Sequence, residues 1–313
     1  MDLDALRVPV IAAPMFLISG PELVIEASRA GAIGAFPAPN CRTVDELDEW
    51  MHTIEQALTD ADGHTLPWAV NLVTHRTNER LPADLEVVAA HRPPIVITAL
   101  GSPKPVMETV KGYGGLVLAD VVSVALARKA AAAEVDGLAC VSAGAGGHTG
   151  HLSPFAFISA VREFFDGIIA VGGGISDGAG VAGAIVAGAD LVYVGTRFLA
   201  TTESMAVPEY KQMVVEHGLD DLIVSSAVTG TDASWLKPSL IANGFDPDDM
   251  GAAHERSYNS GNAAGHARWK EIWAAGQGLQ TIHAVDPTRT VVQRLEAEYR
   301  HALRRRLPAD VTG

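Results

Sequence analysis

The sequence predicts a (β/α)8 barrel that carries a small, mostly helical inserted subdomain after its eighth strand. Eight short apolar runs alternate with amphipathic segments from the start of the chain to about residue 200. The runs are bounded by Gly or Pro and are apolar almost throughout, which is typical of parallel strands covered on both faces. No G-x-G-x-x-G follows the first run, so the pattern favours a barrel over a doubly wound sheet.

The predicted strands are these apolar runs, in chain order. They span Pro9–Ala13, Ala32–Phe36, Trp68–Leu72, Ile95–Thr98, Leu116–Leu118, Gly137–Val141, Ile168–Val171 and Leu191–Val194. The clearest helices between them start at recognisable residues, such as Pro21 at a first helical position and Thr43 as an N-cap followed by acidic residues. We expect helices over residues 21–30, 43–58, 123–133, 153–165 and 177–187.

The chain divides into three parts. Residues 1–201 are expected to form the barrel with the main site, 202–283 a helical insertion or lid, and 284–313 a C-terminal helix that packs back on the barrel. Prolines and a polar Gly/Asn stretch mark the insertion. Within it, Trp269 and Trp273 are four residues apart, which predicts a helix that ends at the glycine turn around Gln277.

Composition excludes several classes of partner. The chain has 23 Lys and Arg against 37 Asp and Glu, a formal net charge of -14, which disfavours nucleic acid and anionic membrane surfaces. No apolar run reaches the ~20 residues of a membrane helix, and residues 1–5 lack a signal-peptide pattern. With only Cys41 and Cys140, the chain has no disulfide framework. We therefore expect a cytoplasmic protein, and the sequence allows a homo-oligomer.

Glycines follow the seventh and eighth predicted strands. Active sites of this fold lie at the C-terminal ends of the strands, and phosphates often bind after strands seven and eight. Gly172, Gly173 and Gly174 offer unhindered amides after strand seven, and Gly195 and Thr196 offer more beside a helix N-terminus. Glycines also permit tight turns without any ligand. We interpret the two loops together as a phosphate cradle.

A histidine lies in the glycine-rich loop after the sixth strand, residues 142–151. His148 in such a loop can exchange a proton near neutral pH, so it is a candidate acid–base group beside a ligand held by the main chain. A simpler alternative is a hydrogen bond from its ring to a backbone carbonyl. His151 is either its partner or an exposed loop residue. Since no cysteine or carboxylate pattern surrounds the pair, we expect no metal.

Two amide side chains complete the candidate site. Asn71 is polar at the end of an apolar strand and needs a partner, either the edge of a cofactor ring or a neighbouring loop. Gln277 stands in a glycine-rich turn after the insertion and could return to cap the site.

In these motifs the chain resembles the nitronate monooxygenase family, formerly called 2-nitropropane dioxygenases. The matching pieces run over nearly the whole chain in conserved order and spacing. They are Ala13-Pro-Met15, Asn71, Gly144-Ala-Gly-Gly-His148, Gly172-Gly-Gly174 with Ser176-Asp-Gly178, Gly195-Thr-Arg-Phe-Leu-Ala200 and Trp273-Ala-Ala-Gly-Gln277. The pieces are less specific for the reaction, because flavin-dependent enoyl reductases and quinone reductases resemble the same pattern.

The resemblance implies FMN bound without a covalent link. Pro14, Met15 and Asn71 would contact its ring system, and Gly146 and Gly147 would lie near the flavin edge. The resemblance assigns the FMN phosphate to Gly172–Gly174, Gly195 and Thr196. His148 matches the family's active-site histidine, which takes a proton from a nitroalkane or lies beside the nitronate. Electrons then pass to O2, and the products are a carbonyl compound and nitrite.

Two positions depart from the family pattern. Many relatives have an acidic residue where Gly144 stands, and many have a lysine near the end of strand five, where this chain has Asp120. An inward carboxylate there would oppose an anionic reduced flavin. Asp120 is alternatively the N-cap of the next helix.

Three other functions fit the same residues. The first alternative is an NAD(P)H-dependent FMN reductase that acts on a quinone or an enoyl substrate. The second is a lyase or isomerase without redox chemistry, with His148 as its base and a sugar phosphate as its substrate. The third is a barrel that binds a phosphate ligand without catalysis.

Overall fold

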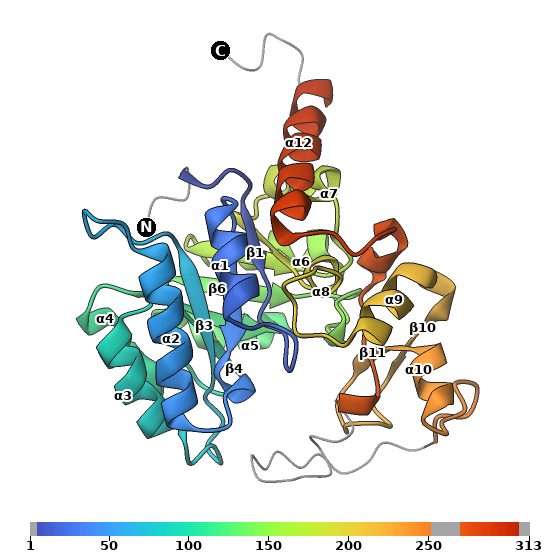
Figure 1. Cartoon of the computed structure of the whole chain (residues 1–313), viewed down its shortest axis with the longest axis horizontal. Coiled ribbons are helices and arrows are strands. Elements are labelled where there is room, and N and C mark those ends of the chain that lie inside the picture. Colours follow the sequence, from blue (N-terminus) through green and yellow to red (C-terminus); the bar gives the residue numbers. More distant parts are fainter. Residues whose placement is uncertain (1–4, 252–269, 307–313) are drawn as a thin grey trace.

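Eight parallel strands close into a barrel in the computed structural model of the chain, which describes residues 5–251 and 270–306 (Figure 1). Sheet pairing runs around the barrel in chain order, and β1 closes it by pairing with β9. The predicted fold class and all eight predicted strands are confirmed. The strands are β1 Val10–Ala12, β2 Ile33–Pro37, β3 Trp68–Val73, β4 Ile95–Ala99, β5 Leu116–Val121, β6 Gly137–Val141, β8 Ile168–Gly172 and β9 Leu191–Val194.

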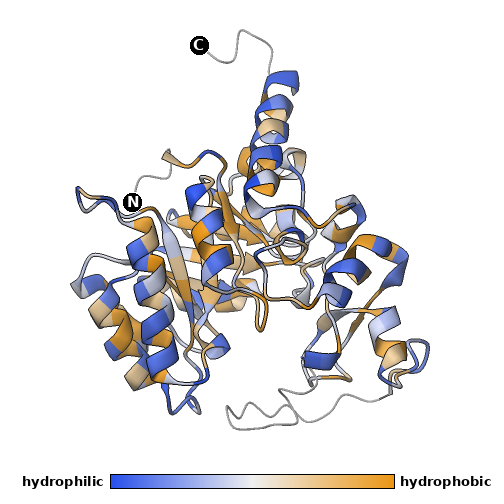
Figure 2. Ribbon diagram, in the orientation of Figure 1, coloured by the Kyte–Doolittle hydropathy of each residue, from blue (hydrophilic) through white to orange (hydrophobic). Residues whose placement is uncertain are grey.

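Helices follow the strands and cover the barrel from outside. They are α1 Pro21–Arg29, α2 Val44–Leu58, α3 Leu81–His91, α4 Lys104–Gly112, α5 Val124–Ala131, α6 Pro154–Arg162, α7 Gly178–Val186 and the short α8 Thr196–Leu199. The predicted helix starts at Thr43 and Asp177 are confirmed. The Thr43 hydroxyl accepts from the amide of Glu46 at 3.1 Å, and the Asp177 carboxylate caps α7 in the same way. Figure 2 shows apolar residues concentrated on the strands and on the helix faces turned toward them.

The barrel has two apolar layers. Side chains alternate along each strand, so one set packs outward against the helices and the other fills the interior. Small and branched residues make up the lower interior, among them Ile11, Ile33, Ile97, Leu118 and Leu191. Cys41 and Cys140 are buried free thiols in the outer layer.

The insertion after the barrel, predicted to be mostly helical, contains two strands as well as helices. It contains α9 Pro208–Glu216 and α10 Lys237–Ala242, the single turns η3 Leu219–Asp221 and η4 Gln277–Thr281, and the strands β10 Leu222–Ser225 and β11 Ala233–Leu236. These two strands form an antiparallel sheet with β7, Gly147–His148, which comes from the barrel's sixth loop. The sheet therefore joins the insertion to the rim of the barrel.

The closing helix α12, Thr288–Arg306, packs against α7 and α1. Its Val291, Val292 and Leu295 belong to the main core, and Glu296 pairs with Arg7 at 2.9 Å. Within the described residues, every helix is either too short or too polar to span a membrane.

Candidate active site at the barrel rim

Unpaired amides gather at the ends of β8 and β9. Within the described residues, the backbone N–H groups of Gly173, Gly174, Gly195 and Thr196 donate no hydrogen bond. Gly173 and Gly174 have φ angles of 142° and 70°, a region that residues other than glycine rarely adopt. Adjacent strands carry these four donors at one edge of the barrel, so they suit an anion.

The N-terminus of α7 is closed to such an anion. The carboxylate of Asp177 accepts from the amide of Gly180 at 2.7 Å, and that of Glu298 on α12 accepts from the amide of Gly178 at 2.8 Å. Two negative charges therefore already satisfy donors of this helix. The amides of Gly173, Gly174, Gly195 and Thr196 are therefore better placed for an anion than the start of α7.

The loop after β6 packs directly on this cradle. The amide of Ser142 donates to the carbonyl of Gly172 at 2.8 Å, and a Cβ on Gly173 would lie 2.5 Å from the carbonyl oxygen of Ala143. Gly173 is thus required by loop packing as well as by its φ angle. The loop then runs into β7, where His148 lies opposite Ala233 of β11. His148 is exposed at the boundary between rim and insertion.

His151 is an exposed loop residue, one of the two alternatives that the sequence left open. Its side chain is 80% accessible, and its Nε2 lies 3.2 Å from a carboxylate oxygen of Asp232. The carbonyl of Asp232 also accepts from the amide of Thr149, so this turn of the insertion holds the loop that carries His148. The carboxylate partner is 81 residues away along the chain, which is why no local pattern revealed it.

Gln277 reaches the rim and explains the glycine at position 144. The backbone amide of Gln277 donates to the carbonyl of Gly144 at 2.9 Å. The side-chain Oε1 of Gln277 would lie 2.8 Å from a Cβ at Gly144, whose φ is 86°. A side chain at position 144 would require the end of the Gln277 side chain to move, and the positive φ disfavours any residue other than glycine.

Backbone packing also explains Gly146. A Cβ there would lie 2.6 Å from the amide nitrogen of Gly276, whose own amide donates to the Thr196 hydroxyl at 2.9 Å. Residues 273–276 are extended rather than helical, which corrects the predicted helix; Trp269 lies outside the described residues. The hydroxyl of Tyr210 bonds both the carbonyl and the amide of Ala274, at 2.6 and 2.9 Å, and its ring stacks on Trp273.

The loop after β1 lies beside the end of β9. Pro14 and Met15 are partly exposed there, and the Sδ of Met15 would be 3.6 Å from a Cβ on Gly195. The side-chain amide of Asn40 fixes the loop by donating to the carbonyls of Met15 and Ser19, at 3.1 and 2.7 Å. Met15 is thereby held next to the cradle.

Polar side chains form the upper interior layer. Asn71 is buried, and its Nδ2 donates to the carbonyl of Ile97 on β4 at 3.2 Å, so a neighbouring strand satisfies this donor. Asp120 points inward, and α5 is capped by the hydroxyl of Ser123, which accepts from Leu126 at 3.3 Å. The prediction that Asp120 caps this helix is wrong.

Two buried polar atoms in this layer lack partners. Among the described residues, nothing bonds the Oδ1 of Asp120 or the hydroxyl of Tyr193. Burial raises the pKa of Asp120 to about 7. Burial, and then the charge of Asp120, raise the pKa of Tyr193 well above its ordinary value. A carboxyl group near half-protonation at neutral pH is typical of functional sites.

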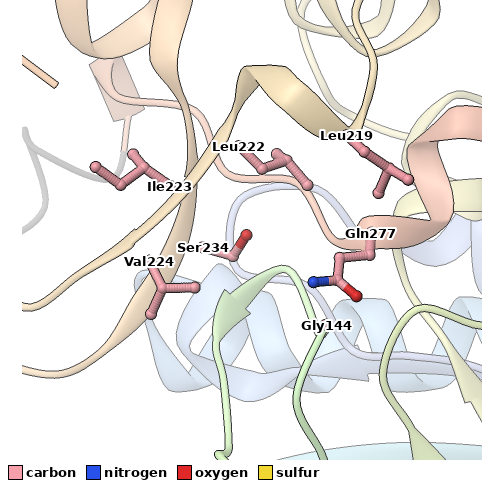
Figure 3. Close-up of a pocket in the computed structure, with 7 residues that line it drawn as sticks. All are labelled: Gly144, Leu219, Leu222, Ile223, Val224, Ser234 and Gln277. Carbon is pink, nitrogen blue, oxygen red and sulfur yellow. The ribbon is translucent and has the colours of Figure 1, made fainter. Parts of the chain in front are cut away.

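A pocket of about 290 Å³ lies between the rim and the insertion (Figure 3). Gly144 of the loop after β6 lines one side of it together with Gln277 and Ser234 of the insertion, and the Gln277 side chain points toward Gly144. Aliphatic residues of the insertion line the rest, namely Leu219, Leu222, Ile223 and Val224. Leu219 and Val224 are 47% and 52% exposed, so the pocket offers apolar surface to a ligand.

The fold and the rim together define a (β/α)8 barrel whose strands present unpaired backbone amides, among the described residues, at their carboxyl ends. More particularly, the chain belongs to the nitronate monooxygenase family, whose model matches residues 64–298. The family resemblance drawn from the motifs is confirmed.

Individual relatives agree with this placement. A nitronate monooxygenase of Neurospora crassa is 30% identical, with 87% of this chain and 81% of the relative covered. A (3aS,4S,5R,7aS)-5-hydroxy-7a-methyl-1-oxo-octahydro-1H-indene-4-carboxyl-CoA dehydrogenase of Rhodococcus jostii is 29% identical over 77% of this chain, and the aligned part spans 65% of that relative's own length. The structure of a nitroalkane oxidase from Streptomyces ansochromogenes has the same fold, with a TM-score of 0.81, 23% identity and coverage of 97% and 99% of the two chains.

Proposed function

We propose that this protein is an FMN-dependent enzyme that oxidises alkyl nitronates with O2 to carbonyl compounds and nitrite. The observation that carries the proposal is the set of four unpaired amides on Gly173, Gly174, Gly195 and Thr196, beside the loop that ends in His148. A phosphate with several acceptor oxygens satisfies such donors. Membership of the nitronate monooxygenase family supplies the reaction class.

The residues of the rim fit this cofactor. The four amides, with Gly172 at the end of β8, would hold the phosphate, and Pro14, Met15 and Asn71 would contact the ring system. The Oδ1 of Asp120 and the hydroxyl of Tyr193 are buried polar atoms that a polar ring edge could satisfy. Gly146, Gly147 and Gln277 would border the ring from the other loops. When bound, FMN supplies the electron transfer from the substrate carbon to O2.

His148 would act on the substrate proton. Its imidazole stands at the exposed edge of β7, where a substrate entering from the insertion side meets it. A neutral imidazole can remove the proton next to a nitro group, and the resulting imidazolium can hold the nitronate anion by charge. Aliphatic residues of the neighbouring pocket, such as Leu222 and Val224, suit the alkyl part of that substrate.

An NAD(P)H-dependent FMN reductase acting on a quinone or enoyl compound is the second candidate. Asp120 favours this second function. Many relatives have a lysine at this position, whereas this chain has an inward carboxyl group, and a carboxyl group opposes negative charge on a reduced flavin. The name of the Rhodococcus relative, a dehydrogenase of a carboxyl-CoA compound, points to the same wider chemistry.

Visible absorption and anaerobic reduction separate these functions. The protein as purified, or after FMN addition, should be yellow. An alkyl nitronate should bleach it without air, and NADH and NADPH should not. Rapid bleaching by NAD(P)H alone would establish the reductase instead. A colourless protein that retains no FMN would refute both and leave a non-redox enzyme or a binding protein. We keep the cytoplasm as the expected compartment.

A further inference from the structure

A cluster of histidines and carboxylates lies on the outer wall of the barrel, away from the rim. Asp48, His52 and Glu55 are on α2, and their spacing of four and then three residues gives them one face of the helix. His91 is the last residue of α3, which packs beside α2 (Figure 1). Two helices therefore bring four potential ligands or ligand partners together.

The cluster centres on the ring of His91. Its Nδ1 lies 2.8 Å from an oxygen of Glu55, and its Nε2 lies 2.9 Å from an oxygen of Asp48. The His91 side chain is only 11% exposed, whereas His52 is exposed. The rings of His52 and His91 are 6.2 Å apart, and the ligand atoms of His52, Glu55 and His91 all lie within 4.8 Å of one another.

The geometry points to a divalent transition-metal site of the zinc type, formed by His52, Glu55 and the Nδ1 of His91. The ion would lie between the Nδ1 of His91 and the carboxylate of Glu55, which are 2.8 Å apart in the structure. Asp48 would keep its hydrogen bond from the Nε2–H of His91, the outer carboxylate that orients a metal-binding imidazole and fixes its tautomer.

The distances suit such an ion after small movements. Zinc lies ~2.0–2.1 Å from imidazole nitrogen and about 2.0–2.2 Å from carboxylate oxygen, so tetrahedral ligand atoms are roughly 3.3 Å apart. The His91 and Glu55 atoms need to separate slightly. His52 needs to approach by turning its side chain, which is exposed and free to do so. Three protein ligands leave one coordination position open.

Donor type selects the ion. Two imidazoles and one carboxylate suit Zn²⁺, Cu²⁺ or Ni²⁺, whereas Mg²⁺ and Ca²⁺ prefer oxygen ligands. The carboxylates of Glu55 and Asp48 face the two nitrogens of His91 and would balance the charge of the ion.

A second cluster provides the matched control. Asp60, Asp62 and His64 are all exposed in the turn after α2. One oxygen of Asp60 already accepts from the amides of Asp62 and His64, both at 2.9 Å, so this group is occupied in shaping the turn. Its ligands lack a buried imidazole and an orienting outer partner.

The test uses the full-length, flavin-loaded protein freed of metal. Zn²⁺ is titrated against a chromogenic chelator, and Mg²⁺ is titrated in parallel. We expect one tight Zn²⁺ site and no comparable binding of Mg²⁺. Asp48→Asn should weaken Zn²⁺ binding about 10–100-fold, as loss of an outer-shell partner does elsewhere. His52→Ala should weaken it further.

His64→Ala should leave the affinity unchanged. Since His52 and His64 are both exposed, neither change is expected to unfold the protein, and thermal melting checks this. The assignment is overturned if His52→Ala binds Zn²⁺ as the parent protein does, or if His64→Ala removes the site. Flavin content and turnover report on the rim separately, so this result and the proposed function stand or fall independently.

Discussion

The lower and upper layers of the barrel interior are built by the same strands from opposite kinds of residue. On β5, Leu118 belongs to the apolar lower layer, and two residues further on Asp120 faces inward with an unpaired oxygen. On β9, Leu191 is followed in the same way by Tyr193. Within one side-chain repeat, the strands change from filling space to presenting polar groups.

The residues that stabilise the fold and the residues available to a ligand therefore lie at different heights along the barrel axis. The lower layer is dry and closely packed, so its residues stabilise the fold through buried apolar area. The upper layer and rim keep donors and acceptors unpaired, which costs stability and leaves them available to a ligand. Mutations in the two layers should therefore affect different measurements.

The largest effect is expected from His148→Ala at the rim. Turnover with a nitroalkane should fall ~10²–10⁴-fold, the usual contribution of a positioned general base, while flavin content and the free energy of unfolding stay nearly unchanged. With preformed nitronate the loss should be smaller, because no proton has to be removed. Steady-state oxygen consumption per bound flavin measures both.

His151→Ala is the matched control, since His151 is three residues away and 80% exposed. It should leave turnover unaltered. A His148→Ala protein that loses flavin but keeps its rate per bound flavin would contradict the assigned role.

Leu118→Ala tests the lower layer. Leu118 is 1% exposed, and removing its side chain leaves a cavity, so the free energy of unfolding should fall by ~2–5 kcal/mol. Turnover per bound flavin should be unchanged, because the rim loops are not touched. Urea unfolding and oxygen consumption measure the two quantities. A loss of stability well under ~1 kcal/mol would show that the two layers are not separated as described.

Asp120→Asn tests the upper layer through pH. The folded pKa of about 7 is raised above the ordinary value of 3.8, so the folded protein binds a proton between these values that the unfolded chain has lost. Stability from this group is therefore present below pH 4 and is lost as pH rises to about 7.

Asn does not titrate, so the variant should match the parent near pH 4 and exceed its free energy of unfolding by about 4 kcal/mol at pH 8. Urea unfolding at a series of pH values measures the difference. A difference of the same size at all pH values would show that Asp120 does not titrate in this window.

The smallest effect is expected from Gly174→Ala in the cradle. Its φ of 70° costs a non-glycine residue ~1–2 kcal/mol, and any shift of the loop misaligns the amides, so FMN affinity should fall about tenfold. Gly188→Ala is the control, because Gly188 also has a positive φ, 110°, but lies at the turn between α7 and β9. It should lose similar stability without losing FMN affinity, as flavin titration would reveal.

Local pattern predicted the barrel strands and helix caps because each depends on residues close in sequence. Continuous apolar runs between glycines and prolines suffice for β3 and β6, and Thr43 lies only three residues from the amide that it caps. The family motifs fall on the rim for the same reason, since each follows its strand directly. The roles of His148, Asn71 and the other site residues stay predictions.

Long-range pairing was beyond the sequence pattern. The sheet in the insertion depends on β11 meeting β7 from the sixth loop, so residues 222–236 gave no sign of it in isolation. Inward placement of Asp120 follows from its strand register opposite Ala139. Likewise, His91 contacts Glu55 and Asp48, which are 36 and 43 residues away along the chain. The expectation of no metal was drawn from residues close together in sequence, so it did not address this cluster.

By itself, therefore, the sequence determined the alternation of strands and helices, the glycine loops at the strand ends and the membership that these motifs reveal. All of these arise from periodicity and from backbone preferences of single residues. Tertiary structure alone decided why Gly144 faces Gln277, which polar atoms of the upper layer remain unpaired and which histidine meets two carboxylates. Those outcomes depend on side chains brought together by barrel closure and helix packing, where distance in space no longer follows distance along the chain.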